Sequence, residues 1–550
     1  MAIPKRALLL SSAAFTFFSF RYAPQVALFP RSYFWNITTL FLLGIFAQLC
    51  WSVILYPLFL SPLRHLPQPP DAHVLLGHFR RIFKDPSGEP QRDWIDTVPN
   101  DGVLYYRWLF NEPRVLVTNP KALGEVLVQR SYDFVKPERL RNGLGRLLGV
   151  GILLAEGDEH KRQRKMLMPA FSFRHVKDLY PIFWSKAQEM TNGIAAAIKN
   201  SPDASSVVEI RDWASRATLD IIGVAGMGRD FDSLTNPANE LNATYRQIFA
   251  GNRYAQLVQL LLSMLPHWLA VNLPLKRNDE IGNAVSTIKK VARDLIREKR
   301  TTFEKGGDIG TDILSVAMES GGFSDEDLVN QLMTFLAAGH ETTASATIWA
   351  VYLLCKHPDV QTRLREEIRT ELPALSNSNS QISSAEIDRL PYLNAVLQET
   401  MRIFPPVPLT LRETAKDTTI QGHFIPARTT IIICPWAINT SVHLWGADAR
   451  EFNPERWLGS GRANTGGAES NYAITTFLHG PRSCIGKDFA KAEFACLVAS
   501  LVGRFELEFE DQAYELKIQG GITAGPKGGL RVRIRGVGGS REEEEKAEVF

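Results

Sequence analysis

The hydrophobic and polar positions divide the chain into an apolar N-terminal part and a longer amphipathic part. No Asp, Glu, Lys or Arg occurs between Ser32 and Leu63. Within this stretch, residues 35–60 are long and apolar enough to cross a hydrocarbon core of about 30 Å as a tilted helix. Trp35 suits interfacial depth, and Arg64 provides a positive flank. The pattern predicts a transmembrane anchor over residues 35–60.

A second apolar stretch, residues 7–20, lies between Lys5-Arg6 and Arg21. Its length leaves three interpretations open: the core of a signal peptide, a short second span, or an interfacial helix. No clear small-residue cleavage site follows it, which argues against a cleaved signal. We therefore expect a retained membrane anchor over residues 1–60, with residues 7–20 as a candidate second span.

Beyond the anchor, a series of prolines cannot continue a helix, so residues 61–70 are predicted to form a stiff hinge. From residue 71 onward the spacing of apolar positions is mostly helical, and short strands come late. We expect one large domain over residues 71–538, mainly α with small β-sheets, and a dispensable acidic tail over 539–550. The clearest predicted elements are helices at 211–226, 279–303, 325–357 and 484–505, a hairpin at 107–118, and strands at 429–434 and 530–535.

Composition narrows the class of protein. Of the 550 residues, 45% are hydrophobic and 22% are charged, which excludes a disordered, collagen-like or coiled-coil protein. The net charge of +3 is too balanced for a dedicated nucleic-acid binder, so no nucleic acid is expected as a partner. The 5 cysteines are scattered without CxxC spacing, which argues against a disulfide framework or a zinc site.

The most informative stretch surrounds Cys484, just before a predicted helix. A cysteine at a helix N-terminus has its thiolate favoured by backbone N–H groups and the helix dipole. Gly480 and Gly486 permit close approaches that a Cβ would block, and Arg482 supplies a cation for an anionic cofactor group. Taken alone, the stretch leaves a reactive thiol and a buried structural cysteine as alternatives.

Phe477, Gly480, Arg482, Cys484 and Gly486 match every fixed position of Phe-x-x-Gly-x-Arg-x-Cys-x-Gly. This is the ligand signature of the cytochrome P-450 family, which binds haem iron through a cysteine thiolate. Three further motifs follow the family's order, and the chain resembles its membrane-bound microsomal members typical of fungi. The resemblance implies a cytochrome P-450 fold, haem b as cofactor, Cys484 as the metal ligand, and Phe477, Arg482 and Gly486 as cofactor-binding residues.

Ala338-Gly339-His340-Glu341-Thr342 lies in the predicted helix 325–357. Ala338 and Thr342 are four residues apart and share one helix face. The small Ala338 leaves room for a flat cofactor, and Thr342 can bond its own helix backbone or present its hydroxyl to oxygen. The alternative is an ordinary helix with a solvated Glu341, which the nearby ligand motif disfavours. The resemblance implies that Thr342 and Glu341 are catalytic, in proton delivery, and that Ala338 binds the cofactor.

Glu399 and Arg402 are spaced i, i+3 and can form an ion pair. If the pair is buried and joined by Arg456, losing one partner would strand a charge. The pattern of the family agrees, so these residues are expected to hold the fold and not to catalyse.

Relatives in the family often carry Trp-x-x-x-Arg, whose Arg binds a haem propionate. This chain departs from the pattern, with His160 in place of the Trp, and retains Arg164. The two can both donate to one propionate, although a merely solvated basic helix is the alternative. Arg412 is another propionate candidate, and His479 is expected to hydrogen-bond within its loop.

The resemblance implies a haem-thiolate monooxygenase that uses O2 to hydroxylate or epoxidise a lipophilic small molecule. A terpenoid, polyketide or alkaloid intermediate of secondary metabolism is favoured. Fatty-acid or xenobiotic hydroxylation, an oxygen-independent haem-thiolate isomerase, and a non-catalytic haem carrier are the alternatives. Isomerases tend to lose the acid–threonine pair that Glu341 and Thr342 retain.

No dinucleotide or flavin motif occurs in the chain, so its electrons must come from a partner. The resemblance implies NADPH–cytochrome P-450 reductase, whose docking face is acidic. Basic residues are available to meet it: Lys161, Arg162, Lys165, Lys487 and Lys491.

The resemblance also implies location in the endoplasmic reticulum membrane with the catalytic domain in the cytosol. Asn36-Ile37-Thr38 is then a lumenal glycosylation triplet, whose use stays open. If residues 7–20 also span the membrane, the extreme N-terminus becomes cytosolic. The apolar segment 257–275 is interpreted as a lid that dips into the membrane.

Overall fold

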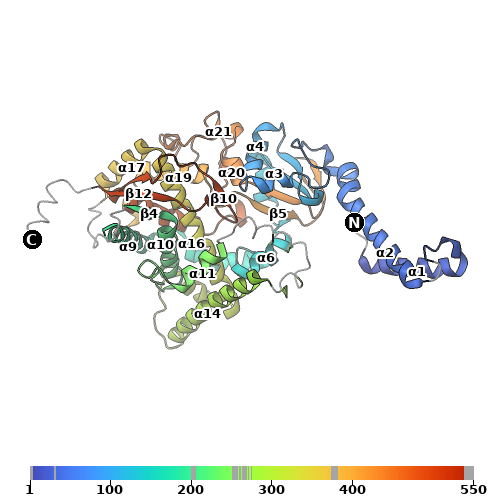
Figure 1. Cartoon of the computed structure of the whole chain (residues 1–550). Helices are drawn as coiled ribbons and strands as arrows, with labels where there is room; N and C mark the ends of the chain where they lie inside the picture. The colour runs from blue at the N-terminus through green and yellow to red at the C-terminus, as the bar shows by residue number, and fades with distance from the viewer. Residues whose placement is uncertain are drawn as a thin grey trace, which may run out of the picture.

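Two helices at the N-terminus project from a helical body that holds several small sheets (Figure 1). The computed structural model describes residues 4–29, 32–199, 206–249, 275–372 and 382–537, with isolated positions between 258 and 273. The structure is 60% helical, which confirms the mainly α fold with small sheets.

The helices follow the predicted amphipathic segments closely. The segment predicted at 279–303 is α14 (Lys276–Glu304), and 325–357 is α16 (Asp325–Lys356). The helix predicted from Cys484 begins later, as α22 (Lys487–Arg504), because Cys484 and Gly486 belong to the preceding loop. The remaining helices are α1 (Lys5–Tyr22), α2 (Tyr33–Cys50), α3 (Phe79–Lys84), α4 (Glu89–Thr97), α5 (Pro120–Gly124), α6 (Glu138–Leu148), α7 (Gly157–Leu167), α8 (Phe173–Asp178), α9 (Tyr180–Lys199), α10 (Ile210–Met227), α11 (Glu240–Phe249), α15 (Ile313–Glu319), α17 (Pro358–Glu371), α18 (Ser384–Ile387), α19 (Pro391–Ile403), α20 (Pro435–Asn439) and α21 (Val442–Trp445).

Helix α16 runs through the middle of the body (Figure 1). Ser324 and Asp327 form a capping box that satisfies backbone N–H groups at its start, and Pro358 follows its end. The helix packs against α10, α14 and α22, so most of its length is buried. A helix that is apolar on nearly all sides is stable only in such a core, and it carries the Ala338–Thr342 motif there.

The strands are short and form four small sheets in the described part of the chain. They are β1 (Val103–Arg107), β2 (Pro113–Val117), β3 (Phe134–Val135), β4 (Val207–Glu209), β5 (Thr410–Thr414), β6 (Thr418–Ile420), β7 (His423–Ile425), β8 (Thr430–Ile433), β9 (Phe505–Phe509), β10 (Ile518–Gly520), β11 (Ala524–Pro526) and β12 (Arg531–Gly536).

The largest sheet has five strands in the order β1-β2-β8-β5-β3. Strands β2 and β8 are parallel, and the other neighbours are antiparallel. The predicted hairpin is confirmed as β1 paired with β2, but its first strand lies earlier than expected, because β1 ends at Arg107 and residues 109–111 form a 3-10 turn. Val103 lies opposite Val117. The other sheets are β4-β12-β9, β10-β11 and β6-β7.

The apolar N-terminal segment forms one long helix from Tyr33 to His65 that could cross a membrane by its length and composition. It starts as α2 and continues as a π-helical segment from Trp51 to Leu60 with Pro57 inside it. Proline lacks a backbone N–H, so the ordinary helical bonding cannot continue unchanged at this point.

The predicted hinge begins at Ser61, where the π-helical segment gives way to a short 3-10 turn from Pro62 to His65, and this segment is packed against the body. Leu63 and Leu66 are buried in the same apolar cluster as strands β1 and β2. The Pro67 carbonyl accepts a hydrogen bond of 2.9 Å from the Tyr105 N–H. Apolar side chains between the prolines therefore bind this segment to the five-stranded sheet, which the proline pattern alone did not reveal.

Two predicted segments fall outside the described residues. They are most of the apolar segment 257–275, interpreted as a lid, and the whole acidic tail 539–550.

Candidate active site

Cys484 lies in a tight loop just before α22. Its N–H donates a hydrogen bond of 2.9 Å to the Phe477 carbonyl, which closes the loop. Gly480 has a φ of +76°, and a Cβ there would come within 2.2 Å of the Leu127 carbonyl oxygen, so the loop requires glycine. Gly486 then leads directly into the helix. The loop therefore holds one thiol at the positive end of a helix dipole.

Cys484 has an exposed side chain, whereas Cys355, Cys434 and Cys496 are buried. The atoms around its thiol still remove water from it, and this desolvation raises the pKa of Cys484. The N–H of Gly486 and the charge of Arg164 oppose the shift because they stabilise a thiolate. Cys484 is therefore able to meet a ligand outside the packed core.

A small accessible patch interrupts the buried part of α16. From Gln331 to Cys355 every residue is buried except Ala338, Gly339, Glu341 and Thr342, which are half-buried. These four belong to the motif identified in the sequence. The Thr342 hydroxyl donates a hydrogen bond of 2.7 Å to the Ala338 carbonyl, so it is held on the same face as that small side chain. The patch leaves room for a ligand beside an otherwise packed helix.

Glu341 is linked to the loop before β11. Its Oε1 accepts a hydrogen bond of 3.2 Å from the Thr523 hydroxyl. Desolvation raises the pKa of Glu341, and the positive charge of Arg211 and the bond from Thr523 only partly oppose this. The bond from Thr523 and the burial thus place a titratable carboxyl beside Thr342 on α16, and a positioned carboxyl of this kind can act in proton transfer.

Arg482 is buried and joins three separate segments. Its guanidinium donates to the Ser131 carbonyl at 3.2 Å and to the Phe134 carbonyl at 2.7 Å, and it forms an ion pair with Glu156. Its Nε has no hydrogen-bond partner among the described residues. The loop of Cys484 is thereby tied to β3 and to the start of α7.

Lys136 and Arg412 lie close to Arg482. Desolvation lowers the pKa of Lys136 well below its usual value, and the charges of Arg412 and Arg482 lower it further. Desolvation likewise lowers the pKa of Arg412 to about 10, again with help from Arg482. Glu156 is the carboxylate that opposes both shifts. We call Lys136, Arg164, Arg412, Arg482 and His160 the basic cradle.

His160 is buried and uncharged at neutral pH. Its Nδ1 lies 3.1 Å from the hydroxyl of Tyr132. Desolvation lowers the pKa of His160 to about 4, and the nearby charge of Arg482 contributes. Because a neutral imidazole still donates one N–H, His160 supplies a donor at the position where many members of the family have a tryptophan.

The basic cradle fits the acidic edge of a haem. The charges of Arg412 and Arg482 lower the pKa of Lys136, and that of Arg482 lowers the pKa of Arg412. Like charges in a partly buried cluster are costly unless an anion compensates them. Glu156 supplies one negative charge, and its Oε2 has no hydrogen-bond partner among the described residues. A group with two carboxylates would balance the cluster. Haem carries two propionates and an iron that a cysteine thiolate can ligate, and Cys484 is an exposed cysteine beside this cluster.

Arg164 contacts the ligand loop directly. Its Nη1 donates a hydrogen bond of 2.7 Å to the Ser483 carbonyl, and its Nη2 lies 3.4 Å from the Ser483 hydroxyl. These bonds hold α7 against the loop. The role of Arg164 at a propionate stays a prediction.

Glu399, Arg402 and Arg456 form the expected buried ion network. Arg402 donates to Glu399 twice at 2.7 Å, and Arg456 donates at 3.2 Å. The side chains of Glu399 and Arg402 are 0% exposed. Trp457 Nε1 also donates to Glu399 at 2.9 Å. The network stabilises the segments that precede the Cys484 loop.

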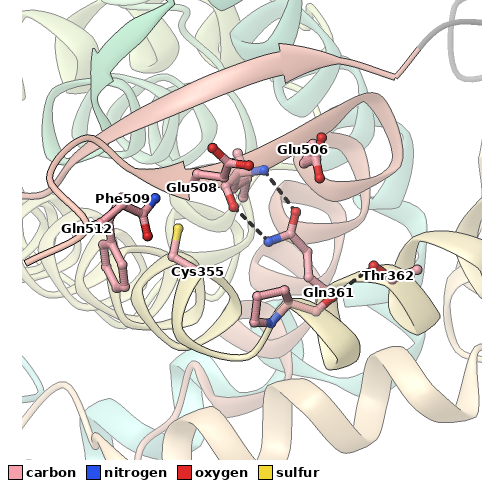
Figure 2. A pocket seen from close by; sticks show the side chains of 9 residues that line it. Cys355, Gln361, Thr362, Glu506, Glu508, Phe509 and Gln512 are labelled. Atoms are coloured by element: carbon pink, nitrogen blue, oxygen red, sulfur yellow. Dashed lines mark hydrogen bonds between the residues drawn. The ribbon is translucent and has the colours of Figure 1, made fainter.

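Figure 2 shows a hollow of about 150 Å³ beside β9 that contains no predicted site residue. Gln361 crosses it, donating to the Leu507 carbonyl at 3.0 Å and accepting from the Leu507 N–H at 2.9 Å (Figure 2). Cys355, which also lines it, has its pKa raised to about 12 by desolvation, so it is not a nucleophile at neutral pH. The hollow lies between α17 and β9, where the two hydrogen bonds of Gln361 connect these elements.

Sequence reasoning missed Tyr132 and Lys136, and it gave Glu156 no role. Glu156 Oε1 accepts from the Lys136 N–H at 2.8 Å as well as from Arg482. Lys136, Glu156 and Arg482 meet only because β3, the start of α7 and the Cys484 loop come together in the fold. No spacing in the sequence signals that meeting.

Comparisons with known proteins agree with this geometry. The model of the cytochrome P-450 family matches residues 67–530. The chain is 48% identical to the cytochrome P-450 monooxygenase sphH of Aspergillus fumigatus, over 90% of this chain and 92% of that protein. It is 43% identical to the monooxygenase FUM15 of Gibberella moniliformis, over 90% and 94% of the two chains. It is 42% identical to ALT8 of Alternaria alternata, over 89% and 92%.

The match covers the ligand loop, the α16 motif and the buried ion network, and it extends through the whole body. The family implies a haem-iron cofactor, molecular oxygen, a reductase that supplies electrons, and a small-molecule substrate. The chain therefore belongs to the cytochrome P-450 family and is a haem-thiolate monooxygenase, similar to members from fungal secondary metabolism.

Proposed function

We propose that haem b is held by the Cys484 thiolate and by the basic cradle. The excess of buried positive charge beside this loop is the observation that carries the proposal. Arg412, Arg482 and Arg164 would meet the propionates together with His160, and Lys136 would join them. Phe477, Gly486 and Ala338 would contact the ring system. When bound through a thiolate, haem iron supplies O–O bond cleavage and insertion of one oxygen atom into an unactivated bond.

Thr342 and Glu341 are proposed to manage protons at the oxygen-binding face. Thr342 is held beside Ala338 by its 2.7 Å bond to the backbone, where its hydroxyl can exchange that bond for one to a ligand. Glu341 has the raised pKa that a proton carrier needs, and the Thr523 hydroxyl orients it. An oxygen-independent isomerase needs neither group, so their pairing favours a monooxygenase.

NADPH–cytochrome P-450 reductase is the proposed electron donor. Lys165 and Lys487 are exposed and lie on α7 and α22, the two helices next to the Cys484 loop. Lys161 and Arg162 belong to the same surface, although they pair with Asp158 and Glu159. A basic surface steers an acidic partner toward the haem edge by long-range attraction. Desolvation lowers the pKa of Lys491 to about 8, so its contribution weakens above that pH.

The endoplasmic reticulum membrane is the proposed location, with a cytosolic catalytic domain over residues 71–538. The long apolar helix from Tyr33 to His65 supports membrane attachment. Attachment to a bilayer favours a lipophilic substrate that arrives through lipid, and a terpenoid, polyketide or alkaloid intermediate fits this route.

The test is turnover in a reconstituted system. The full chain is co-expressed with the reductase, and microsomes are supplied with NADPH and lipophilic precursors. We expect NADPH-dependent oxygen uptake and a product heavier by one oxygen atom. A product that forms without oxygen or reductase would instead support the isomerase.

A further inference from the structure

Helices α1 and α2 pack against each other as an antiparallel pair. Near the turn between them, the rings of Phe20 and Tyr33 lie 4.1 Å apart. Farther from the turn, a Cβ at Gly44 would lie 2.8 Å from Cδ1 of Leu8. The contacts move away from the turn along both helices, which is possible only if the two run in opposite directions. In Figure 1 the turn is at the end of the pair farthest from the body.

The face of α1 that meets α2 is lined by hydroxyl side chains. Ser12, Thr16 and Ser19 are spaced by four and three residues and are all buried. Each donates to a carbonyl of its own helix, at 2.8, 2.8 and 3.0 Å. Their hydrogen bonds are satisfied without water, and their small size lets α2 approach closely. Membrane helices associate through faces of this kind.

Asn36 closes the turn between the helices. Its side chain is 2% exposed, and its Nδ2 donates a hydrogen bond of 2.7 Å to the Phe29 carbonyl. Its Oδ1 accepts from the Phe29 N–H at 3.1 Å. Nδ2 is the atom that N-glycosylation would modify, and it is buried and engaged. The turn is thereby stabilised, and the triplet that begins at Asn36 is blocked.

The other faces of α1 are apolar and exposed. Large side chains project from it beside the exposed apolar side chains of α2. Many large apolar side chains exposed on two helices outside the body indicate contact with lipid acyl chains. Its main members are Leu9, Leu10, Phe15, Phe17 and Phe18 on α1 and Leu42, Leu43, Phe46 and Leu49 on α2.

The dimensions of the pair match a bilayer. At the body end, Nδ2 of Asn111 donates to the Val53 carbonyl at 2.7 Å, which fixes where the helix meets the body. From Tyr33 to Val53 the helix rises about 30 Å, the thickness of a hydrocarbon core. Helix α1 has 18 residues and rises about 27 Å beside it. Arg6 and Arg21 lie near its two ends, where long basic side chains can reach the headgroups.

We propose that α1 is a second membrane span and that residues 5–60 form a helical hairpin anchor in the lipid bilayer. The N-terminus then lies on the same side of the membrane as the catalytic body, and the turn at Asn36 lies on the opposite side without a glycan. The inference rests on the proposed membrane attachment and adds the number of spans, the topology and the packing that joins them.

Tags at both ends of the chain test the topology in sealed microsomes. We expect external protease to remove both tags from the full-length enzyme. Protection of the N-terminal tag while the C-terminal tag is cut would overturn the hairpin. Protection of both tags would contradict the cytosolic location and still support the hairpin, so the two proposals can fail separately.

The turn is tested with a glycosylation acceptor on a flexible linker inserted between Gln25 and Val26. We expect the inserted acceptor to be glycosylated, because the turn reaches the lumen, and the wild-type chain to show no shift with endoglycosidase. Thr38→Ala, which removes the native triplet, should leave the wild-type mobility unchanged. An unmodified linker, or a native glycan lost in Thr38→Ala, would contradict the proposal.

Cross-linking tests the packing, with Cys50 replaced by Ser throughout. Leu8→Cys with Gly44→Cys should form a disulfide on mild oxidation, detected as fragments that stay joined after cleavage at a protease site placed in the turn. Leu10→Cys with Gly44→Cys is the matched control, because Leu10 is exposed on another face. Equal cross-linking of the two pairs would show that α1 does not pack as described.

Discussion

The guanidinium of Arg164 donates a hydrogen bond of 2.7 Å to the carbonyl of Ser483, the residue before Cys484. This bond joins α7 to the ligand loop, although the two residues are 319 positions apart in the sequence. It also places a positive charge where it stabilises the Cys484 thiolate. One arginine can therefore serve both the loop and the acidic edge of the cofactor.

Replacing Arg164 should weaken haem binding. A hydrogen bond to a charged group is worth about 1.5–3 kcal/mol, so Arg164→Ala should lower haem affinity by about ten- to a hundredfold. Haem content per protein and the rate of haem transfer to apomyoglobin measure this. Lys165→Ala, at the exposed neighbouring position, is the control and should behave as wild type.

Lys136→Met should have opposite effects with and without haem. In the haem-free protein Lys136 is a desolvated cation near Arg412 and Arg482, so its removal should raise the unfolding temperature. In the holoenzyme the propionates would pair with it, so the same change should lower haem affinity. The unfolding temperatures of the haem-free protein and the holoenzyme measure both effects, and Lys121→Met, at an exposed position of α5, is the control. The same sign in both forms would contradict an anion in the cradle.

Thr342→Ala should keep haem and substrate binding but lose coupling. Without the hydroxyl, electrons from NADPH should go to hydrogen peroxide in place of product. The control is Thr347→Ala, whose hydroxyl makes a similar bond of 2.9 Å to the Thr343 carbonyl in the buried part of α16. NADPH consumed, peroxide formed and product formed are measured together. Unchanged coupling in Thr342→Ala would assign proton delivery to another group.

Glu399→Ala should destabilise the fold. It would leave Arg402 as a buried cation, at a cost of roughly 3–5 kcal/mol. An exposed pair such as Arg293 with Glu326 is worth about 0–1 kcal/mol, so Arg293→Ala is the matched control. The free energy of unfolding, measured with denaturant, should fall much further in Glu399→Ala than in Arg293→Ala. Similar stability in the two would mean that the Glu399 network does not hold the fold.

The sequence predicted those parts of the site whose signals are local. The Cys484 loop requires Gly480, where a Cβ would meet the Leu127 carbonyl, whereas a Cβ at Gly486 would make only an ordinary contact of 3.6 Å with Phe171. The Ala338–Thr342 motif lies within one helix, so its 3.6-residue period places both residues on one face. The Glu399–Arg402 pair is likewise spaced for a single helix turn.

Contacts between distant segments could not be predicted in this way. Lys136 and Glu156 meet Arg482 only after β3 and the start of α7 come together with the Cys484 loop. The prolines over residues 61–70 indicated a stiff hinge and gave no sign that Leu63 and Leu66 pack into the core beneath the sheet. Such contacts depend on how the whole body packs, and no regular spacing in the sequence predicts them.

Cys484 is the proposed iron ligand, and the other roles proposed at the site depend on it. The absorbance difference spectrum of the reduced carbon-monoxide complex tests it directly, measured on the wild type and on Cys484→Ala with Cys355→Ala, a buried cysteine, as control. We expect the thiolate-type Soret band in the wild type and in Cys355→Ala, and its complete loss in Cys484→Ala. A thiolate-type band that persists in Cys484→Ala would contradict the assignment.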